Sequence, residues 1–175
     1  MTQHAFVVAD IALHRDDLIA LNVEYLTWVF AGVEQHFQIP ADQITGMPVH
    51  DYVPGVIDKV CGDLPPKGIF YLVTVDNKLA GMGGLRFVRD GVAEIKRIFL
   101  RPGFRGMKLG EHLLHRLLVD ASNFGYRHIC LDTAPFMQSA HRLYETNGFT
   151  DCAAYAETEV PAELHSRWRF MERAL

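Results

Sequence analysis

The sequence lacks several features that would assign it to whole classes of protein. Its three cysteines, Cys61, Cys130 and Cys152, are too few and too irregularly spaced for a disulfide framework or a zinc site, which indicates free thiols in a reducing compartment. No apolar run reaches the roughly 18 residues that span a membrane, and the N-terminus does not resemble a secretory signal. These observations predict a cytoplasmic protein without a membrane partner.

Positive charge is also scarce. The formal net charge is −4 and no dense basic run is present, so we expect no nucleic-acid partner. The chain has 175 residues, of which 49% are hydrophobic and 22% charged. No internal repeat, linker or low-complexity segment divides it, and its length fits one domain over residues 1–175.

The feature that organises the chain is a predicted strand, loop and helix between residues 92 and 125. The strand over 92–100 ends before a Pro-Gly pair, and leucines at helical spacing begin at residue 109. Arg105 and Lys108 lie where the helix dipole disfavours positive charge, and an anion bound in the loop would reverse that penalty. The pattern therefore indicates a phosphate-binding loop, although a solvated turn with incidental basic residues would have the same composition.

Two motifs in this region carry a family resemblance. The loop RGMKLG (residues 105–110) resembles the acyl-CoA signature Arg/Gln-x-x-Gly-x-Gly/Ala of the GCN5-related N-acetyltransferases, with Lys108 in place of the middle glycine. Downstream, AHRLYETNGF (residues 140–149) is similar to the family's Ala-x-x-Leu-Tyr-x-x-x-Gly-Phe helix. Two motifs in the family's order are more specific than either alone.

The order of predicted elements supports the fold that the resemblance implies. This is an α/β fold with a mixed, mostly antiparallel central sheet and helices on both faces. We predict strands over 5–9, 69–75, 78–88, 92–100, 128–133, 149–155 and 167–171, and helices over 14–30, 53–62, 109–124 and 139–147. Ser139 is the candidate N-cap of the last helix, and residues 32–49 are expected to be irregular.

The resemblance also implies that acetyl-CoA is the acyl donor. The backbone of residues 98–100 would pair with the pantetheine arm, and an N–H near Phe99 would polarise the thioester carbonyl. The loop and the first helical turn would hold the pyrophosphate. The residues expected to bind CoA are Ile98, Phe99, Leu100, Arg105, Gly106, Met107, Lys108, Leu109, Gly110 and Glu111.

Two residues are the candidates for proton transfer. Tyr144 occupies the tyrosine of the second motif, where the resemblance implies a phenol that protonates the leaving thiolate; without the resemblance, a core tyrosine would be expected. Glu94 is the candidate base, because a carboxylate on an apolar strand is costly to bury unless it is paired. A salt bridge from Glu94 to Lys96 or Arg97 explains the same position equally well.

Together these features predict an N-acetyltransferase in which a primary amine, from a small molecule or a peptide, attacks acetyl-CoA directly in a ternary complex. The acceptor pocket should be lined by the first two helices and the acidic loop 157–166; its candidate residues are Tyr25, Trp28, His36, Tyr155, Glu157 and Glu159. A non-catalytic acyl-CoA-binding or regulatory module is the alternative, and an unrelated phosphate-binding protein is a third option. We expect no metal, since His112 and His115 lack matching ligands. A homodimer is common in such families.

Overall fold

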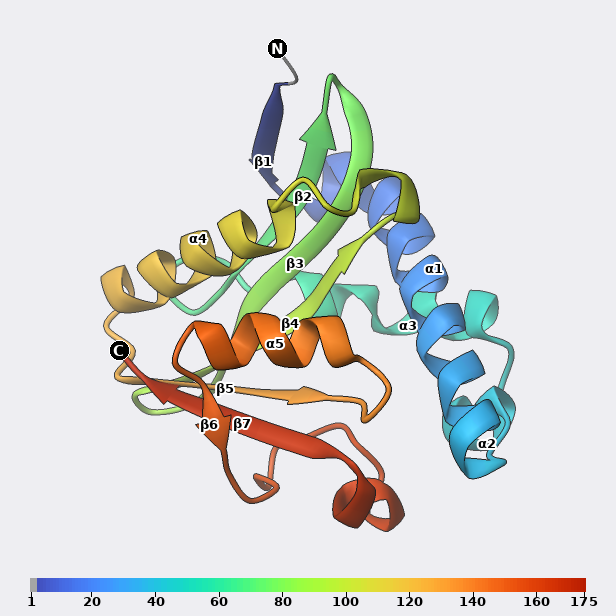
Figure 1. The fold of residues 1–175 in the computed structure, drawn as a ribbon. Coiled ribbons are helices and arrows are strands. Elements are labelled where there is room, and N and C mark those ends of the chain that lie inside the picture. The colour runs from blue at the N-terminus through green and yellow to red at the C-terminus, as the bar shows by residue number, and fades with distance from the viewer. Residues whose placement is uncertain (1–2) are drawn as a thin grey trace.

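The computed structural model describes residues 3–175, which form a seven-stranded sheet in the order β1-β2-β3-β4-β5-β7-β6 (Figure 1). Neighbouring strands are antiparallel except β4 and β5, which are parallel. The strands are β1 (His4–Val8), β2 (Ile69–Val75), β3 (Lys78–Arg89), β4 (Val92–Leu100), β5 (His128–Thr133), β6 (Thr150–Asp151) and β7 (Arg169–Ala174). The predicted mixed, mostly antiparallel sheet is confirmed.

Helices cover both faces of this sheet. They are α1 (Ile11–Phe37), α2 (Ala41–Thr45), α3 (Val49–Cys61), α4 (Leu109–Asn123) and α5 (Gln138–Thr146), with 3₁₀ turns at Pro102–Phe104 and Ala162–Arg167. Along β2 the side chains alternate, so that Tyr71 packs in a core cluster with α4 while Phe70 and Leu72 pack in another with α1 and α3. Figure 1 shows α4 and α5 in front of the sheet and α1 and α3 behind it. No helix among residues 3–175 is long and apolar enough to cross a membrane.

Four predictions about helices were wrong. The helix predicted over 53–62 is α3, which begins four residues earlier, at Val49. The first helix begins earlier than predicted because the Asp10 side chain caps it, accepting hydrogen bonds from the N–H groups of Ala12 and Leu13. It also continues to Phe37, and α2 follows, so residues 32–49 are mostly helical rather than irregular. Ser139 does not cap α5, which starts one residue earlier without a side-chain cap.

The strand β4 contains one extra residue relative to β3. Gly84 lies opposite Lys96 and Met82 opposite Phe99, so two steps on β3 face three on β4, and Arg97 takes a left-handed φ of 55°. Lys96 and Arg97 consequently both lie on the α1 side of the sheet, where Arg97 bonds to a residue of α1. Beyond the bulge, Ile98 packs in the cluster of α4.

The sheet opens between β4 and β5. Only Val92–Glu94 of β4 pair with β5, opposite His128–Cys130, and Figure 1 shows the two strands separating beyond that point. Among the described residues, the edge of β4 from residue 95 to 100 that faces β5 therefore has no strand partner. Unpaired backbone groups on such an edge can bind an extended ligand that carries amides.

Candidate active site

The loop before α4 presents a row of backbone N–H groups. Gly106 and Lys108 both have a left-handed backbone, with φ of 81° and 58°, and no side chain caps α4. The N–H groups of residues 106–111 have no acceptor among the described residues. A glycine-containing turn followed by an uncapped helix N-terminus is an anion-binding arrangement.

The two cations of this loop, Arg105 and Lys108, differ in their contacts with the rest of the protein. The Arg105 Nε donates to the Leu100 carbonyl at 3.1 Å, and its guanidinium lies 5.8 Å from the centre of the Trp28 ring. The Lys108 side chain is exposed and makes no hydrogen bond to the described protein. Its left-handed φ explains why the family signature has glycine at this position, since lysine adopts that conformation only at a cost of about 1 kcal/mol.

The predicted pantetheine strand borders the opening in the sheet. The Arg101 N–H donates to the Ala80 carbonyl of β3 at 2.8 Å. Because alternate N–H groups of a strand point to opposite sides, the Leu100 N–H faces the open edge and the Phe99 N–H faces β3. The N–H available for a ligand carbonyl is therefore that of Leu100 rather than Phe99.

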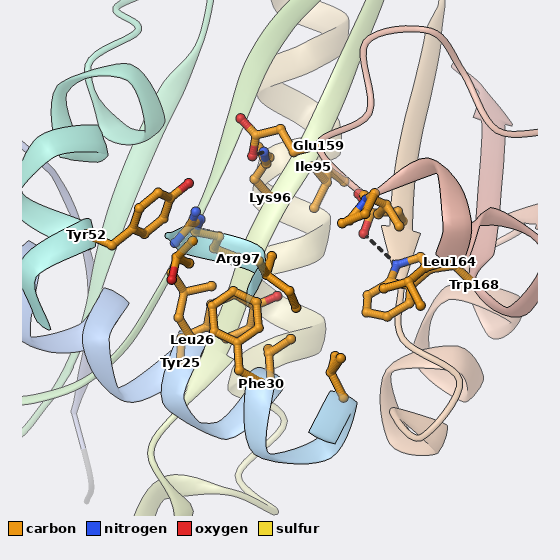
Figure 2. Close-up of a pocket in the computed structure, with 17 residues that line it drawn as sticks. Tyr25, Leu26, Phe30, Tyr52, Ile95, Lys96, Arg97, Glu159, Leu164 and Trp168 are labelled. Carbon is orange, nitrogen blue, oxygen red and sulfur yellow. Dashed lines mark hydrogen bonds and ion pairs between the residues drawn. The ribbon is translucent and has the colours of Figure 1, made fainter. Parts of the chain in front are cut away.

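A cavity lies on the other side of this opening, against α1 (Figure 2). It contains about 860 Å³ of space, including its open mouth. Its walls come from α1, α2, α3, β4, the end of β5 and the segment before β7. The lining residues used below are Tyr25, Tyr52, Arg97, Asp132, Glu159 and Leu164.

Asp132 is the carboxylate of this cavity that the sequence reasoning did not select. It lies near the end of β5 and accepts a hydrogen bond from Trp168 Nε1 at 2.9 Å, drawn as a dashed line in Figure 2. Burial raises its pKa to about 6, and the nearby charge of Glu94 adds to that increase. A carboxyl whose pKa approaches the working pH is suited to proton transfer. The signal in the sequence is an aspartate near the end of a predicted strand, a position that an ordinary strand-end turn explains equally well.

Tyr144 approaches the same region from α5. It is 7% exposed and packs against the Phe149 ring at 5.7 Å between centroids. Burial raises the pKa of its phenol, and Tyr25 and Asp132 add to the increase. The phenol therefore carries its proton at neutral pH. It makes no hydrogen bond to the described protein, so its O–H is available to donate to a ligand. Its catalytic role remains a prediction.

Glu94 has the surroundings of an ion-pair partner. It is 1% exposed, accepts from Arg86 Nε and Tyr155 Oη at 2.5 Å each, and does not line the cavity. Of the partners suggested by the sequence, Lys96 lies 3.9 Å away and Arg97 forms no ion pair with it. Its role as the base stays a prediction that the geometry does not favour, since both oxygens are already occupied.

The other residues predicted around the acceptor divide into two groups. Tyr25 and Glu159 line the cavity. Trp28 and His36 instead pack against Phe136, at 6.4 and 5.0 Å between ring centroids, and do not line it. The rest form structural pairs: Tyr155 with Glu94, and Glu157 with Arg89 at 2.8 Å.

The histidines considered as metal ligands have other partners. His112 stacks on His4 at 5.4 Å between centroids, and His115 Nε2 lies 2.7 Å from Asn147 Oδ1. Within residues 3–175, no group of three or more His, Cys, Asp or Glu side chains is arranged to hold a metal ion.

Comparison with known proteins identifies relatives that are described as acetyltransferases, N-acetyltransferases or N-acetylaspartate synthetases. The sequence profile of the Acetyltransferase (GNAT) family matches residues 37–149. An uncharacterized N-acetyltransferase of Schizosaccharomyces pombe is 30% identical over 155 residues, covering 87% of this chain and 86% of the relative. The N-acetylaspartate synthetase of Xenopus tropicalis is 28% identical over 102 residues, covering 58% of this chain and 38% of that protein.

Solved structures share the fold over its whole length. A GNAT-family acetyltransferase of Staphylococcus aureus superimposes with a TM-score of 0.72 at 20% identity, with 99% of each chain covered. The PaiA N-acetyltransferase of Thermoplasma acidophilum, solved in complex with coenzyme A, gives a TM-score of 0.70 at 19% identity and the same coverage.

Proposed function

The chain belongs to the acetyltransferase (GNAT) family, and from that premise we propose that it is an N-acetyltransferase that moves an acetyl group from acetyl-CoA to a primary amine. The observation that carries the proposal is the cavity with Asp132 on one side of the opening between β4 and β5, and the N–H loop of residues 106–111 on the other. The thioester would pass through the opening and meet the amine in the cavity. This arrangement supports direct attack in a ternary complex.

In the proposed binding mode, the N–H groups of residues 106–111 hold the pyrophosphate of CoA. The unpaired edge of β4, residues 98–100, pairs with the amides of the pantetheine arm. The Leu100 N–H, which faces that edge, is positioned to donate to a carbonyl oxygen there. Met107, Leu109 and Glu111 contribute through their backbone N–H groups.

In the proposed reaction, the amine nitrogen bonds to the thioester carbon and releases a proton to the Asp132 carboxylate. The C–S bond then breaks, and the thiolate sulfur takes the phenolic proton of Tyr144. Asp132 fits the first step because its pKa of about 6 leaves it deprotonated at neutral pH. We assign Glu94 to orienting Arg86 and Tyr155 rather than to proton transfer.

The relatives suggest acceptor classes to examine. The names of two similar proteins, N-acetylaspartate synthetase and an IAA acetyltransferase of Azospirillum brasilense that is 29% identical over 83 residues, refer to different acceptors. A free amino acid and other small amines therefore both belong in a first panel.

The test is thiol release from acetyl-CoA in the presence of a panel of primary amines. We expect amine-dependent release, and we expect Tyr144→Phe to lower kcat by about 100-fold while changing the Kd of acetyl-CoA less than about two-fold, because only the proton donor is lost. An unchanged kcat would remove Tyr144 from the mechanism. If the protein binds acetyl-CoA but no amine causes thiol release, the non-catalytic acyl-CoA-binding module is favoured.

A further inference from the structure

Arg97 is a cation in the cavity without a carboxylate partner. It is half-buried, and within residues 3–175 no Asp or Glu oxygen lies within 4.0 Å of its guanidinium. Its contacts are a hydrogen bond from Nη1 to the Asn22 Oδ1 at 2.7 Å and the ring of Tyr25 at 5.8 Å. Figure 2 shows the guanidinium beside Tyr25 and Tyr52, where its remaining donors are open to the cavity. A half-buried guanidinium with donors to spare favours an anionic ligand.

Two features hold this guanidinium in place, and each lowers the stability of the fold. Arg97 occupies the left-handed bulge of β4, a conformation that arginine rarely adopts. Asn22, from the middle of α1, is 0% exposed. Its Nδ2 donates to the Leu18 carbonyl at 2.7 Å and contacts the Cys61 Sγ at 3.8 Å, which leaves Oδ1 to accept from Arg97. A buried asparagine whose oxygen serves a single guanidinium indicates that the position of the Arg97 side chain in the cavity is important for function.

The other cations near the cavity already have ion-pair partners. Glu159 lies 2.5 Å from Lys96, 3.5 Å from Arg86 and 3.4 Å from Lys59. Burial acts to raise the pKa of Glu159, but the surrounding cations outweigh it and lower the pKa to about 2, so the carboxylate stays charged and paired. The cavity is thus left with an unpaired guanidinium at Arg97 and the proposed base at Asp132.

Most of the remaining wall residues are apolar. They consist of Leu26, Val29, Phe30, Val33, Ile44 and Leu164, with the rings of Tyr25, Tyr52 and Trp168. An aliphatic or aromatic body would bury its surface there, at about 25 cal/mol per Å².

We infer that the acceptor is a free amino acid with an apolar side chain, whose carboxylate binds Arg97 while its amine faces Asp132. This inference rests on the proposed function and specifies its substrate class. A peptide N-terminus fits less well because an amide stands where Arg97 requires a carboxylate. A diacid such as aspartate fits less well because the walls offer its second carboxylate no unpaired cation among the described residues.

The test compares matched acceptors that differ only in the carboxylate. Leucine, leucinamide and isoamylamine form one series, phenylalanine, phenylalaninamide and phenethylamine a second, and aspartate is added alone. We expect kcat/KM to be about 10- to 100-fold higher for each free amino acid than for its amide or decarboxylated amine, as for loss of a charge-assisted hydrogen-bonded pair. Arg97→Met should remove that preference, chiefly through KM, and Asn22→Ala should weaken it.

Arg127→Met is the matched control, because Arg127 is exposed just before β5, at the end opposite Asp132, and should leave the preference intact. Circular dichroism and melting temperature establish that each variant is folded. Equal kcat/KM for acids and amines, or a preference that survives in folded Arg97→Met, overturns the inference and leaves the acetyltransferase activity standing. If none of the amines in either series supports thiol release from acetyl-CoA, the proposed function is overturned, and this inference with it.

Discussion

At the scale of single residues, Asp132 connects the proposed chemistry with stability. Its pKa is raised to about 6 by burial, so the protonated form is favoured in the folded protein relative to the unfolded chain. At pH 7.5 the carboxylate is charged and destabilises the fold. That penalty disappears as the pH falls from about 6 toward the ordinary aspartate pKa of about 4. A destabilising charge inside a cavity is more readily explained by function than by folding.

We therefore predict opposite effects of Asp132→Asn on activity and stability. The amide can still accept the Trp168 hydrogen bond but cannot take a proton. At pH 7.5, kcat/KM should fall by about 100-fold or more, and its dependence on a group of pKa near 6 should vanish. The melting temperature should rise at pH 7.5 and rise much less at pH 4. Pre-steady-state kinetics and thermal melts at both pH values measure these effects.

Glu94→Gln is the control for this prediction. Removing its charge leaves Arg86, whose side chain is 13% exposed, without its closest carboxylate, so we expect a loss of about 3 kcal/mol or more in stability. The folded fraction should keep the pH dependence of Asp132, but at a pKa below 6, because the charge of Glu94 no longer raises it. If Glu94→Gln abolishes that dependence and Asp132→Asn preserves it, the base is Glu94.

At the scale of elements, the loop and first turn of α4 contain a glycine that the fold does not need. A Cβ added at Gly110 would meet only Leu100 and Leu143, at an ordinary 3.8 Å, and the backbone there is helical. In a helix, alanine is more stable than glycine by about 1 kcal/mol. Room for a closely approaching ligand is the remaining explanation for glycine at this position.

Gly110→Ala should therefore raise the melting temperature and weaken the binding of CoA. The added methyl group would stand among the N–H groups that we propose bind the pyrophosphate, so we expect Kd to rise about 10-fold or more. Thermal shift and calorimetry with CoA measure the two effects. Lys108→Gly is the comparison: it should also stabilise the protein by relieving a left-handed lysine, but change Kd only at low salt, since its side chain is exposed. Unchanged CoA affinity in Gly110→Ala would contradict the proposed site.

The elements with strong local patterns were predictable from the sequence. The strands over 69–75 and 92–100 have the predicted bounds, because β-branched and aromatic runs end there at turn residues. The start of α4 was equally clear from its leucine spacing. The extension of α1 to Phe37 was missed because residues 32–49 were expected to be irregular, whereas in the structure Gly32 lies within the helix and makes room for the Phe136 ring.

The site was predictable only where a motif marked it. The loop of residues 105–110 and Tyr144 belong to the two family-like motifs. Asp132 and Arg97 depend on contacts between distant segments: burial and Trp168 for the first, a bulge and Asn22 for the second. Neither contact leaves a local pattern in the sequence. The partner of Glu94 was missed for the same reason, since Arg86 lies opposite it on β3.

At the scale of the whole molecule, the two parts of the proposed CoA site lie along one path. Among residues 3–175, the edge of β4 over residues 95–100 has no strand partner and the N–H groups of the loop over 106–111 have no acceptor. A 3₁₀ turn connects the two segments. A ligand that bridges both would order a region next to the opening without changing the sheet around it.

Hydrogen–deuterium exchange should report this path directly. Saturating acetyl-CoA, at about 100 times its Kd, should slow exchange in segments 95–100 and 106–111 beyond the general protection of about 2.7 kcal/mol that binding confers. The β2 strand, already paired on both sides, should change least. At the same concentration, which is about 10 times its raised Kd, Gly110→Ala should keep only about 1.4 kcal/mol of this protection, so the loop should exchange about 10-fold faster than in the unsubstituted complex. Protection confined to other segments would place the ligand elsewhere.

The extra residue in β4 also matters for reading homologous sequences. Because Arg97 is an insertion relative to the regular alternation of the strand, a relative without the bulge will align only with a one-residue gap at this point. If the gap is placed a position too early or too late, an apolar side chain of the neighbouring core cluster is compared with the cation of the cavity. Acceptor preference across such relatives should therefore be sorted first by whether the insertion is present, and only then by which residue occupies it.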